Sequence, residues 1–214
     1  NECFSKHKPA PRGGSGGGRF GGRSGGSGGR FGGRGGGGAV MGHKNLHSIA
    51  VRGSNKVDVH DPPALRELTK QVIKDYKTPG GAMEPWSKGG TPNFFSIAWE
   101  SGSAPSYNWA DDVYGKYDAD KISWPGEFDQ ILKKTDTCHV CAIGCRRVSH
   151  GGRGKTDAKY EIEDGVEGVE YENMTMLGSN CGIHDLWAIN KINDLCNLYG
   201  LDTISTGGTI SFAM

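Results

Sequence analysis

Residues 183–200 read "IHDLWAINKINDLCNLYG" and predict a helix that ends at Gly200, a residue suited to the left-handed conformation that closes many helices. A further helix is expected to begin around Thr206 and to continue to the end of the sequence. Upstream, "DPPALRELTKQVIKDYK" (61–77) has the pattern of an amphipathic helix, with Asp61 as its candidate N-cap and prolines in its first turn. These segments favour a fold that is mostly α with minor β structure (α+β).

The remaining segments predict shorter elements. Residues 78–126 are rich in Gly, Pro and Ser, so we expect long loops there that carry aromatic anchors. Other expected elements are a half-buried strand at 46–53, a short helix at 125–134, a strand at 159–163 and a short helix or strand at 171–178. The apolar face of the 61–77 helix is expected to pack in the core, and it consists of Leu65, Leu68, Val72 and Ile73.

The composition fits a soluble protein. The chain has 214 residues, 35% of them hydrophobic, and a formal net charge of +1, which suits one or two domains. No apolar run is long enough to cross a bilayer, and a charge near zero argues against strong attraction of the whole chain to nucleic acid. Because the sequence begins at Asn1 rather than Met and ends on the apolar "TISFAM", we expect a fragment of a longer protein.

A low-complexity segment occupies residues 1–38, where an eleven-residue unit occurs twice, as "GGRFGGRSGGS" and "GGRFGGRGGGG". Glycine-rich sequence has little to bury against the entropy cost of ordering, so this segment is predicted to be disordered. It also has the composition of RNA-binding tails, whose arginines contact phosphates and whose aromatic rings stack on bases. RNA binding is the weaker alternative, because the rest of the chain has no basic surplus.

Three cysteines crowd into the sequence "TCHVCAIGCRR" and are Cys138, Cys141 and Cys145. Their C-x2-C-x3-C spacing allows one loop to provide three thiolates to a [4Fe–4S] cluster, with a distant residue as the fourth ligand. A zinc site that uses Cys138, Cys141 and either His139 or His150 is the main alternative, and free cysteines are a third. Disulfides at this spacing would be strained, so we expect a reducing, cytoplasmic compartment.

Spacing alone does not identify the fourth ligand. Cys181 and Cys196 are candidates, although Cys196 lies among apolar residues of a predicted helix, where a buried inert thiol is the common outcome. Cys3 is expected to lie outside the fold.

Several stretches, taken in order, resemble signatures of the tungsten-containing aldehyde ferredoxin oxidoreductases. They are "GRGGGGAVMGHKNLHSIAVRG" (33–53), "GTPNFFSIAWESGSAPSYNW" (90–109), "CHVCAIGC" (138–145), "GVEYENMTMLGSNCGIHD" (168–185) and "NDLCNLYGLDTISTGGTISFAM" (193–214). The last two together are far more specific than any cysteine spacing. The resemblance implies that residues 39–53 end an N-terminal pterin-binding domain and that residues 54–214 are part of a helical middle domain.

The resemblance also implies a function. It implies a bis-pterin cofactor that carries tungsten, or sometimes molybdenum, beside a [4Fe–4S] cluster, in an enzyme that oxidises a small aldehyde to a carboxylic acid and passes electrons to ferredoxin. It admits a homodimer. Some members bind an iron at the dimer interface through Glu-x-x-His, but "AINKIND" (188–194) has neither residue, so no such iron is expected. An electron-transfer subunit with a cluster and no tungsten is the alternative.

The resemblance assigns the metal ligands and part of the pterin site. Cys138, Cys141 and Cys145 correspond to three cluster ligands, and the fourth is expected downstream, outside this sequence. The family's first pterin motif, Asp-x-x-Gly-Leu-Asp, reads "NLYGLD" here, with Asn197 in place of the first Asp and with Leu201 and Asp202 unchanged. An amide can still accept a hydrogen bond and can also donate one.

Two further residues are assigned by the resemblance. Glu172 is expected near the metal, where a carboxylate in a dry pocket gains basicity and can act as a general base. Glu170 is expected to lie farther from the metal and to matter less. Arg34, in the glycine-rich turn "GRGG", is expected near the pterin phosphates, where small residues allow close backbone approach.

Overall fold

The structure is a computed structural model that describes residues 36–50, 52–53, 57–110, 115–138, 140–153 and 161–214. Its α-helices are α1 (Gly37–His43), α2 (Pro62–Tyr76), α3 (Glu84–Gly89), α4 (Phe95–Glu100), α5 (Lys116–Ile122), α6 (Tyr171–Asn173), α7 (Leu186–Tyr199) and α8 (Thr203–Ala213). Its strands are β1 (Leu132–Asp136), β2 (Arg146–Ser149), β3 (Gly152–Arg153) and β4 (Glu161–Ile162). Short 3-10 segments are η1 (Thr91–Phe94), η2 (Tyr107–Trp109), η3 (Glu127–Gln130) and η5 (Ser179–Cys181), and a π-helical turn, η4 (Met174–Gly178), follows α6.

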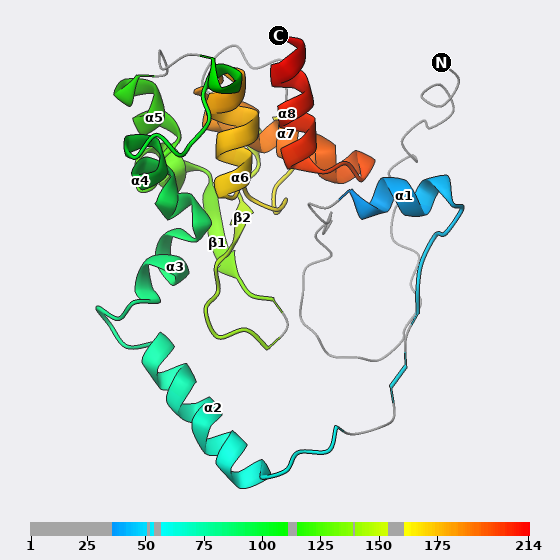
Figure 1. Cartoon of the computed structure of the whole chain (residues 1–214), viewed down its shortest axis with the longest axis vertical. Coiled ribbons are helices and arrows are strands. Elements are labelled where there is room, and N and C mark those ends of the chain that lie inside the picture. Colours follow the sequence, from blue (N-terminus) through cyan, green and yellow to red (C-terminus); the bar gives the residue numbers. More distant parts are fainter. Residues whose placement is uncertain (1–35, 51, 54–56, 111–114, 139, 154–160) are drawn as a thin grey trace.

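The core lies where α4, α5 and the segment before β1 pack against α6, η4 and α7. Figure 1 shows α4 and α5 on one side of the molecule and α6, α7 and α8 on the other. The buried core side chains are Phe95, Ala104, Ala119, Ile122, Phe128, Ile131, Val169, Met174, Leu177, Leu186 and Ile189. Because the sheets are two-stranded antiparallel ribbons, β1–β2 and β3–β4, the prediction of a mostly α fold with minor β structure is confirmed.

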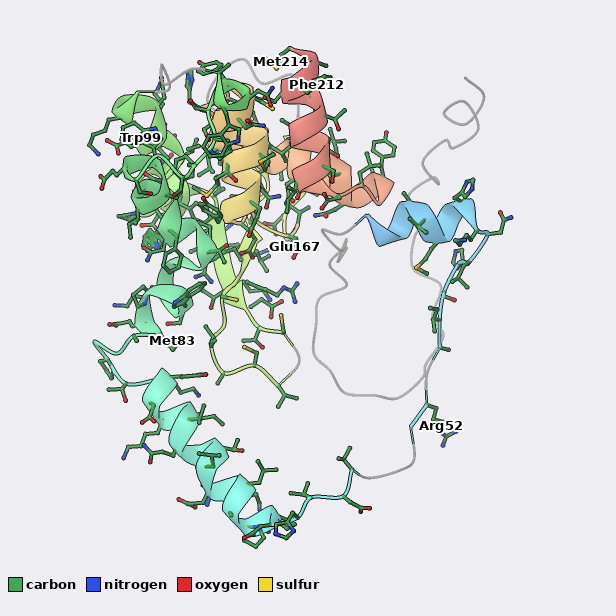
Figure 2. All side chains as sticks on the ribbon, in the orientation of Figure 1. Arg52, Met83, Trp99, Glu167, Phe212 and Met214 are labelled. Carbon is green, nitrogen blue, oxygen red and sulfur yellow. The ribbon has the colours of Figure 1, made fainter. Side chains whose placement is uncertain are left out.

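The C-terminal helices follow the capping signals in the sequence. Asp185 caps the start of α7, where its side chain accepts from two backbone N–H groups of the first turn. Gly200 ends this helix with φ 69°, as expected. The last helix begins at Thr203, earlier than the predicted start at Thr206, because the side chain of Asp202 accepts from a first-turn backbone N–H group and acts as the N-cap. At the far end of α8, Phe212 and Met214 are exposed (Figure 2).

The helix predicted at 61–77 is present as α2, but its predicted role in the core is wrong. Asp61 caps it as expected, because its Oδ1 accepts from the N–H of Ala64 at 3.0 Å. Figure 1 shows α2 apart from the other helices. The exposed fractions of the four apolar residues are 48% for Leu65, 61% for Leu68, 36% for Val72 and 38% for Ile73. The amphipathic pattern predicts an apolar face but does not reveal whether a partner element covers it.

Other expected elements differ from the structure. Residues 46–50 and 52–53 are exposed and form no strand, and none of the described strands pairs with them. Residues 78–126 contain α3, α4 and α5 rather than long loops throughout. The short helix expected at 125–134 is the 3-10 turn η3, which leads directly into β1. The expected strand at 159–163 is present as β4 in its described part.

Most of the segment predicted to be disordered, residues 1–35, lies outside the described residues. Its last residues, Gly37 and Gly38, begin α1, so the prediction of disorder up to residue 38 is wrong at these two positions. Among the described helices, none is both long enough and apolar enough to span a bilayer.

Candidate cluster and cofactor site

The β1–β2 hairpin presents the three clustered cysteines in its loop. Asp136 and Arg146 are the last cross-strand pair, and the loop between them contains Cys138, Cys141 and Cys145. The N–H of Cys141 donates to the carbonyl oxygen of Cys138 at 3.1 Å, so the first two cysteines lie on one tight turn. Cys138 is exposed, whereas Cys141 and Cys145 are half-buried. An antiparallel hairpin therefore fixes both ends of the loop and leaves Cys138 exposed and the other two cysteines half-buried.

The electrostatics of this loop disfavour a thiolate that has no cationic partner. Partial burial raises the pKa of the Cys145 thiol, and the nearby negative charges of Glu170, Cys138 and Cys141 raise it further. Iron would offset this repulsion, because its positive charge stabilises the thiolate forms. Three thiols on one loop would suit a cluster in which each cysteine sulfur ligates a different iron atom.

Neither the zinc site nor the iron–sulfur cluster finds an assembled set of ligands in the described residues. There, no group of three or more His, Cys, Asp or Glu side chains, the three loop cysteines included, is arranged to hold a metal ion. His150 lies beside Asp164, with 3.9 Å between its Nδ1 and the carboxylate Oδ1. The other candidate ligand, His139, lies outside the described residues.

Arg147, which was not predicted from the sequence as a site residue, is hydrogen-bonded to the backbone of the cysteine loop. It is only 1% exposed. Its Nη1 donates to the carbonyl oxygen of Gly144 at 3.0 Å, and its Nη2 donates to the carbonyl oxygens of Trp86 and Ser87 at 3.2 and 3.1 Å. The guanidinium therefore connects the loop to the C-terminal turn of α3. Burial lowers the pKa of Arg147, and the negative charges of Glu170 and Cys145 oppose that effect.

The sequence held only a partial signal for this residue. Two arginines follow Cys145, and alternation along a strand requires them to point to opposite faces. Arg146 forms ion pairs, at 3.7 Å with Asp136 and at 3.9 Å with Glu167, which is labelled in Figure 2. Nothing in the sequence indicates which of the two arginines faces inward.

Glu170 was expected to matter less than Glu172, but it is buried and its carboxylate caps the start of α6. It is 3% exposed and forms a capping box with Asn173, in which each side chain accepts from the other residue's backbone N–H. The hydroxyl of Thr91 donates to the Glu170 carboxylate and accepts from the N–H of Tyr171 at 3.0 Å. These contacts fix the start of α6 against η1, and they could not be read from the sequence, because Thr91 is far away along the chain.

Glu172 lies in the first turn of α6, just before the π-helical turn η4. Its Oε2 is buried and has no hydrogen-bond partner within the described part of the chain. A buried carboxylate oxygen without a donor is costly, so it marks a place where a ligand, proton or water is needed. Burial, followed by the charge of Glu172, raises the pKa of the adjacent Tyr171. A π-turn directly after this residue is a feature that often occurs at functional sites.

The two segments assigned to the pterin are in contact. The N–H of Ala39 donates to the carbonyl oxygen of Gly200 at 3.1 Å. A Cβ placed on Gly38 would lie 3.2 Å from Cα of Gly200, and one placed on Gly36 would lie 3.3 Å from the backbone N of Asp202. Gly36 also has φ 64°, a conformation that favours glycine. The glycines are therefore required for the start of α1 to lie against the "NLYGLD" turn.

Within that turn, the assigned residues differ in their surroundings. The Oδ1 of Asn197 is buried and lacks a partner among the described residues. Asp202 uses its Oδ2 to accept from the N–H of Ser205 at 2.7 Å, so it caps α8. Leu201 is 38% exposed. Arg34 lies outside the described residues. The unpartnered amide of Asn197 beside a glycine-lined turn suits a polar ligand.

The remaining described cysteines are buried in the helical body. The Sγ of Cys181 donates to the carbonyl oxygens of Met176 at 3.3 Å and Gly207 at 3.5 Å. Burial raises the pKa of both Cys181 and Cys196. These surroundings suit inert thiols, so a fourth cluster ligand outside this chain stays a prediction.

Comparison with known proteins identifies relatives along most of the chain. A family model described as "Aldehyde ferredoxin oxidoreductase, domains 2 & 3" matches residues 67–214. A tungsten-containing aldehyde ferredoxin oxidoreductase from Pyrococcus furiosus is 36% identical over 177 residues, which are 83% of this chain and 27% of that protein. One of the same description from Pyrococcus horikoshii is 38% identical over 178 residues, again 83% of this chain and 27% of that protein.

A more distant relative has a different description. It is an "Aliphatic sulfonate oxidoreductase, WOR-like subunit" from Pyrococcus furiosus, 28% identical over 177 residues, which are 82% of this chain and 27% of that protein. The chain thus spans 27% of the length of the curated relatives it matches.

Proposed function

Because the chain belongs to the aldehyde ferredoxin oxidoreductase family, we propose that it provides the cluster-binding loop and part of the pterin site of a larger tungsten-containing enzyme. This complete protein oxidises an aldehyde to the carboxylic acid and passes the electrons through a [4Fe–4S] cluster to ferredoxin. Molybdenum is the alternative metal. A larger protein is part of the proposal because the chain spans only 27% of the matched relatives.

The observation that supports this proposal most strongly is the contact between Ala39 and Gly200. It joins the start of α1, which directly follows the glycine-rich turn in the sequence, to the "NLYGLD" turn, and the family resemblance assigns both turns to the same cofactor. Glycines at 36 and 38 leave the backbone there uncovered by side chains, which suits the close approach of phosphate or pterin groups.

In this proposal, Asn197, Leu201 and Asp202 hold one side of the pterin, together with Arg34. The Oδ1 of Asn197 is the acceptor that lacks a partner, so a pterin N–H group could satisfy it. The metal–pterin group, when bound, supplies the two-electron oxidation at the aldehyde carbon. The residues of this chain bind and orient that group.

Cys138, Cys141 and Cys145 are proposed to hold three corners of the cluster. The β1–β2 hairpin fixes the ends of their loop, and Arg147 anchors the loop through Gly144. The fourth ligand is proposed to lie outside these residues. With a cluster at this place, electrons can leave the buried active site toward an acceptor protein at the surface.

Glu172 is proposed as the general base. As water adds its oxygen to the aldehyde carbon, the Glu172 carboxylate accepts a proton from that water. The support for this role is its buried Oε2 without a partner in the described chain. An oxygen that accepts no hydrogen bond from the protein is available to accept a proton.

Aldehyde is proposed as the substrate class in preference to sulfonate. The relatives described as aldehyde enzymes are 36% and 38% identical to the chain, whereas the sulfonate oxidoreductase subunit is 28% identical. The identity of the aldehyde depends on a pocket that these residues do not complete.

The test is aldehyde-dependent reduction of ferredoxin by the complete protein, prepared without oxygen. Turnover with at least one small aldehyde, and release of the matching carboxylic acid, is the expected result. If the protein exchanges electrons with ferredoxin but oxidises no aldehyde, it is an electron-transfer subunit and the proposal is wrong.

A further inference from the structure

Arg147 places a buried positive charge next to the backbone of the cysteine loop. Its guanidinium donates to the carbonyl oxygen of Gly144, the residue before Cys145. Gly90, with φ 65°, lies so close that an added Cβ would be 2.7 Å from the carbonyl oxygen of Cys145 and 3.1 Å from Cζ of Arg147. The loop, the guanidinium and the end of α3 are therefore packed without intervening side chains. The Nε–H of Arg147 is buried and has no acceptor among the described residues.

Glu170 brings the opposite charge to the same place. Its carboxylate accepts from the hydroxyl of Thr91, the residue that follows Gly90, so it is attached next to the point where Gly90 contacts Cys145 and Arg147. It is held there by the hydroxyl of Thr91 and the backbone N–H of Asn173, both of which donate to it. These donors suit an ionised carboxylate. Arg147 and Glu170 are 1% and 3% exposed, so solvent screens neither charge effectively.

We propose that the buried charges of Arg147 and Glu170 together set the reduction potential of the [4Fe–4S] cluster held by the cysteine loop. This inference rests on the proposed function, because it requires the cluster at Cys138, Cys141 and Cys145. Both are positioning residues: neither is a ligand, and each acts on the cluster through its charge. No comparison with a relative assigns them this role.

The cluster gains one electron on reduction. A reduced cluster is more negative than the oxidised one, so a nearby buried cation favours the reduced form and raises the potential. A nearby buried anion favours the oxidised form and lowers it. Arg147 and Glu170 therefore act in opposite directions, and removing either charge shifts the potential in a direction known in advance.

A purely structural role makes a different prediction. If Arg147 and Glu170 only hold the loop and α6 in place, loss of either would loosen the site in the same general way. The shifts in potential would then not depend on the sign of the charge removed. Opposite shifts from two neighbouring substitutions are the signature of electrostatic control.

The experiment is a redox titration of the complete, anaerobically prepared protein, with the reduced cluster followed by electron paramagnetic resonance. Arg147→Gln is expected to lower the midpoint potential and Glu170→Gln to raise it. Each changes the ratio of reduced to oxidised cluster at a fixed potential by on the order of tenfold, which is about 59 mV for one electron. The double variant is expected to return near the wild-type value, and Arg147→Lys, which keeps the charge, is expected to shift the potential least.

Arg146→Gln is the matched control. This neighbouring arginine is 18% exposed at its side chain and has two carboxylate partners, Asp136 and Glu167, so its removal is expected to shift the potential much less. If Arg147→Gln does not fold, Glu170→Gln is compared with Glu170→Asp, which keeps the charge. A raised potential in Glu170→Gln with a nearly unchanged one in Glu170→Asp supports the electrostatic role, and equal shifts in both overturn it.

Shifts of the same sign in Arg147→Gln and Glu170→Gln, or unchanged potentials in both, would overturn the inference. This failure is distinguishable from failure of the proposed function. In the first case the wild-type protein contains iron, sulfide and the resonance of a reduced cluster. In the second case the wild-type protein itself lacks these signals.

Discussion

Ala39 and Gly200 are joined by a backbone hydrogen bond of 3.1 Å, which holds the beginning of α1 against the turn between α7 and α8. Gly200 has φ 69°, and a Cβ at this position would lie 2.7 Å from the backbone N of Ala39. The contact thus depends on the absence of a side chain at Gly200. If the two segments enclose one side of the pterin, this contact controls cofactor binding.

Gly200→Ala tests that dependence. The left-handed conformation costs an L-residue about 1–2 kcal/mol, and the added methyl group would push α1 away. The complete protein is therefore expected to lose tungsten and pterin while it retains iron, as measured by elemental analysis and pterin fluorescence. Gly37→Ala is the control, because nothing lies within 4 Å of a Cβ there. Normal pterin content in Gly200→Ala would show that this contact is dispensable.

Serine substitution tests the cluster ligands. Cys138→Ser, Cys141→Ser and Cys145→Ser are each expected to lower the iron and sulfide content, because a serine oxygen is a poorer ligand for iron than a thiolate. Cys181→Ser and Cys196→Ser are expected to retain iron, since both thiols are buried in the helical body. An emptied cluster in Cys196→Ser would mean that the fourth ligand lies within this chain.

Glu172→Gln tests the general base. The amide keeps the size of the side chain but cannot take the proton, so kcat is expected to fall about a hundred- to ten-thousand-fold while tungsten, pterin and iron stay bound. Glu161→Gln is a suitable control, because Glu161 is exposed on β4. Glu170 is unsuitable as a control, because it is buried and caps α6. Unchanged kcat in Glu172→Gln, measured by steady-state kinetics, would exclude the catalytic role.

Two residues of α4 test the placement of the core. Phe95 is fully buried, whereas Ile97 is 62% exposed on the same helix. Phe95→Ala is expected to lower the free energy of unfolding by about 3–5 kcal/mol, because it removes buried area and leaves a cavity. Ile97→Ala is expected to change it by no more than about 0.5 kcal/mol. The midpoints of urea unfolding provide the comparison, and equal losses would contradict the orientation of α4.

The parts of the fold that sequence predicts well are those decided by local signals. The end of α7 follows from Gly200, and the cap of α2 follows from Asp61, because these effects involve residues only a few positions apart. The cysteine loop is also local, so the spacing of its three thiols is enough to place them on one loop, whereas the cluster itself stays a prediction.

The parts that sequence predicts poorly depend on contacts between distant segments. The apolar face of α2 is visible in the sequence, but whether another element covers it is not. The alternating pattern at 46–53 lacks a partner strand in the described chain, so its described residues form no strand and are exposed. The contact between Thr91 and Glu170 and the burial of Arg147 also cannot be predicted from the sequence. Both depend on how α3 and α6, which are distant along the chain, pack around the hairpin.

Analysis of iron, tungsten and pterin in the same anaerobic preparation of the complete protein tests the central claim most directly. All three are expected together, with molybdenum as the substitute if tungsten is missing. Iron without tungsten, molybdenum or pterin would contradict the claim and indicate an electron-transfer subunit, and zinc in place of iron would show that the cysteine loop binds a single metal ion.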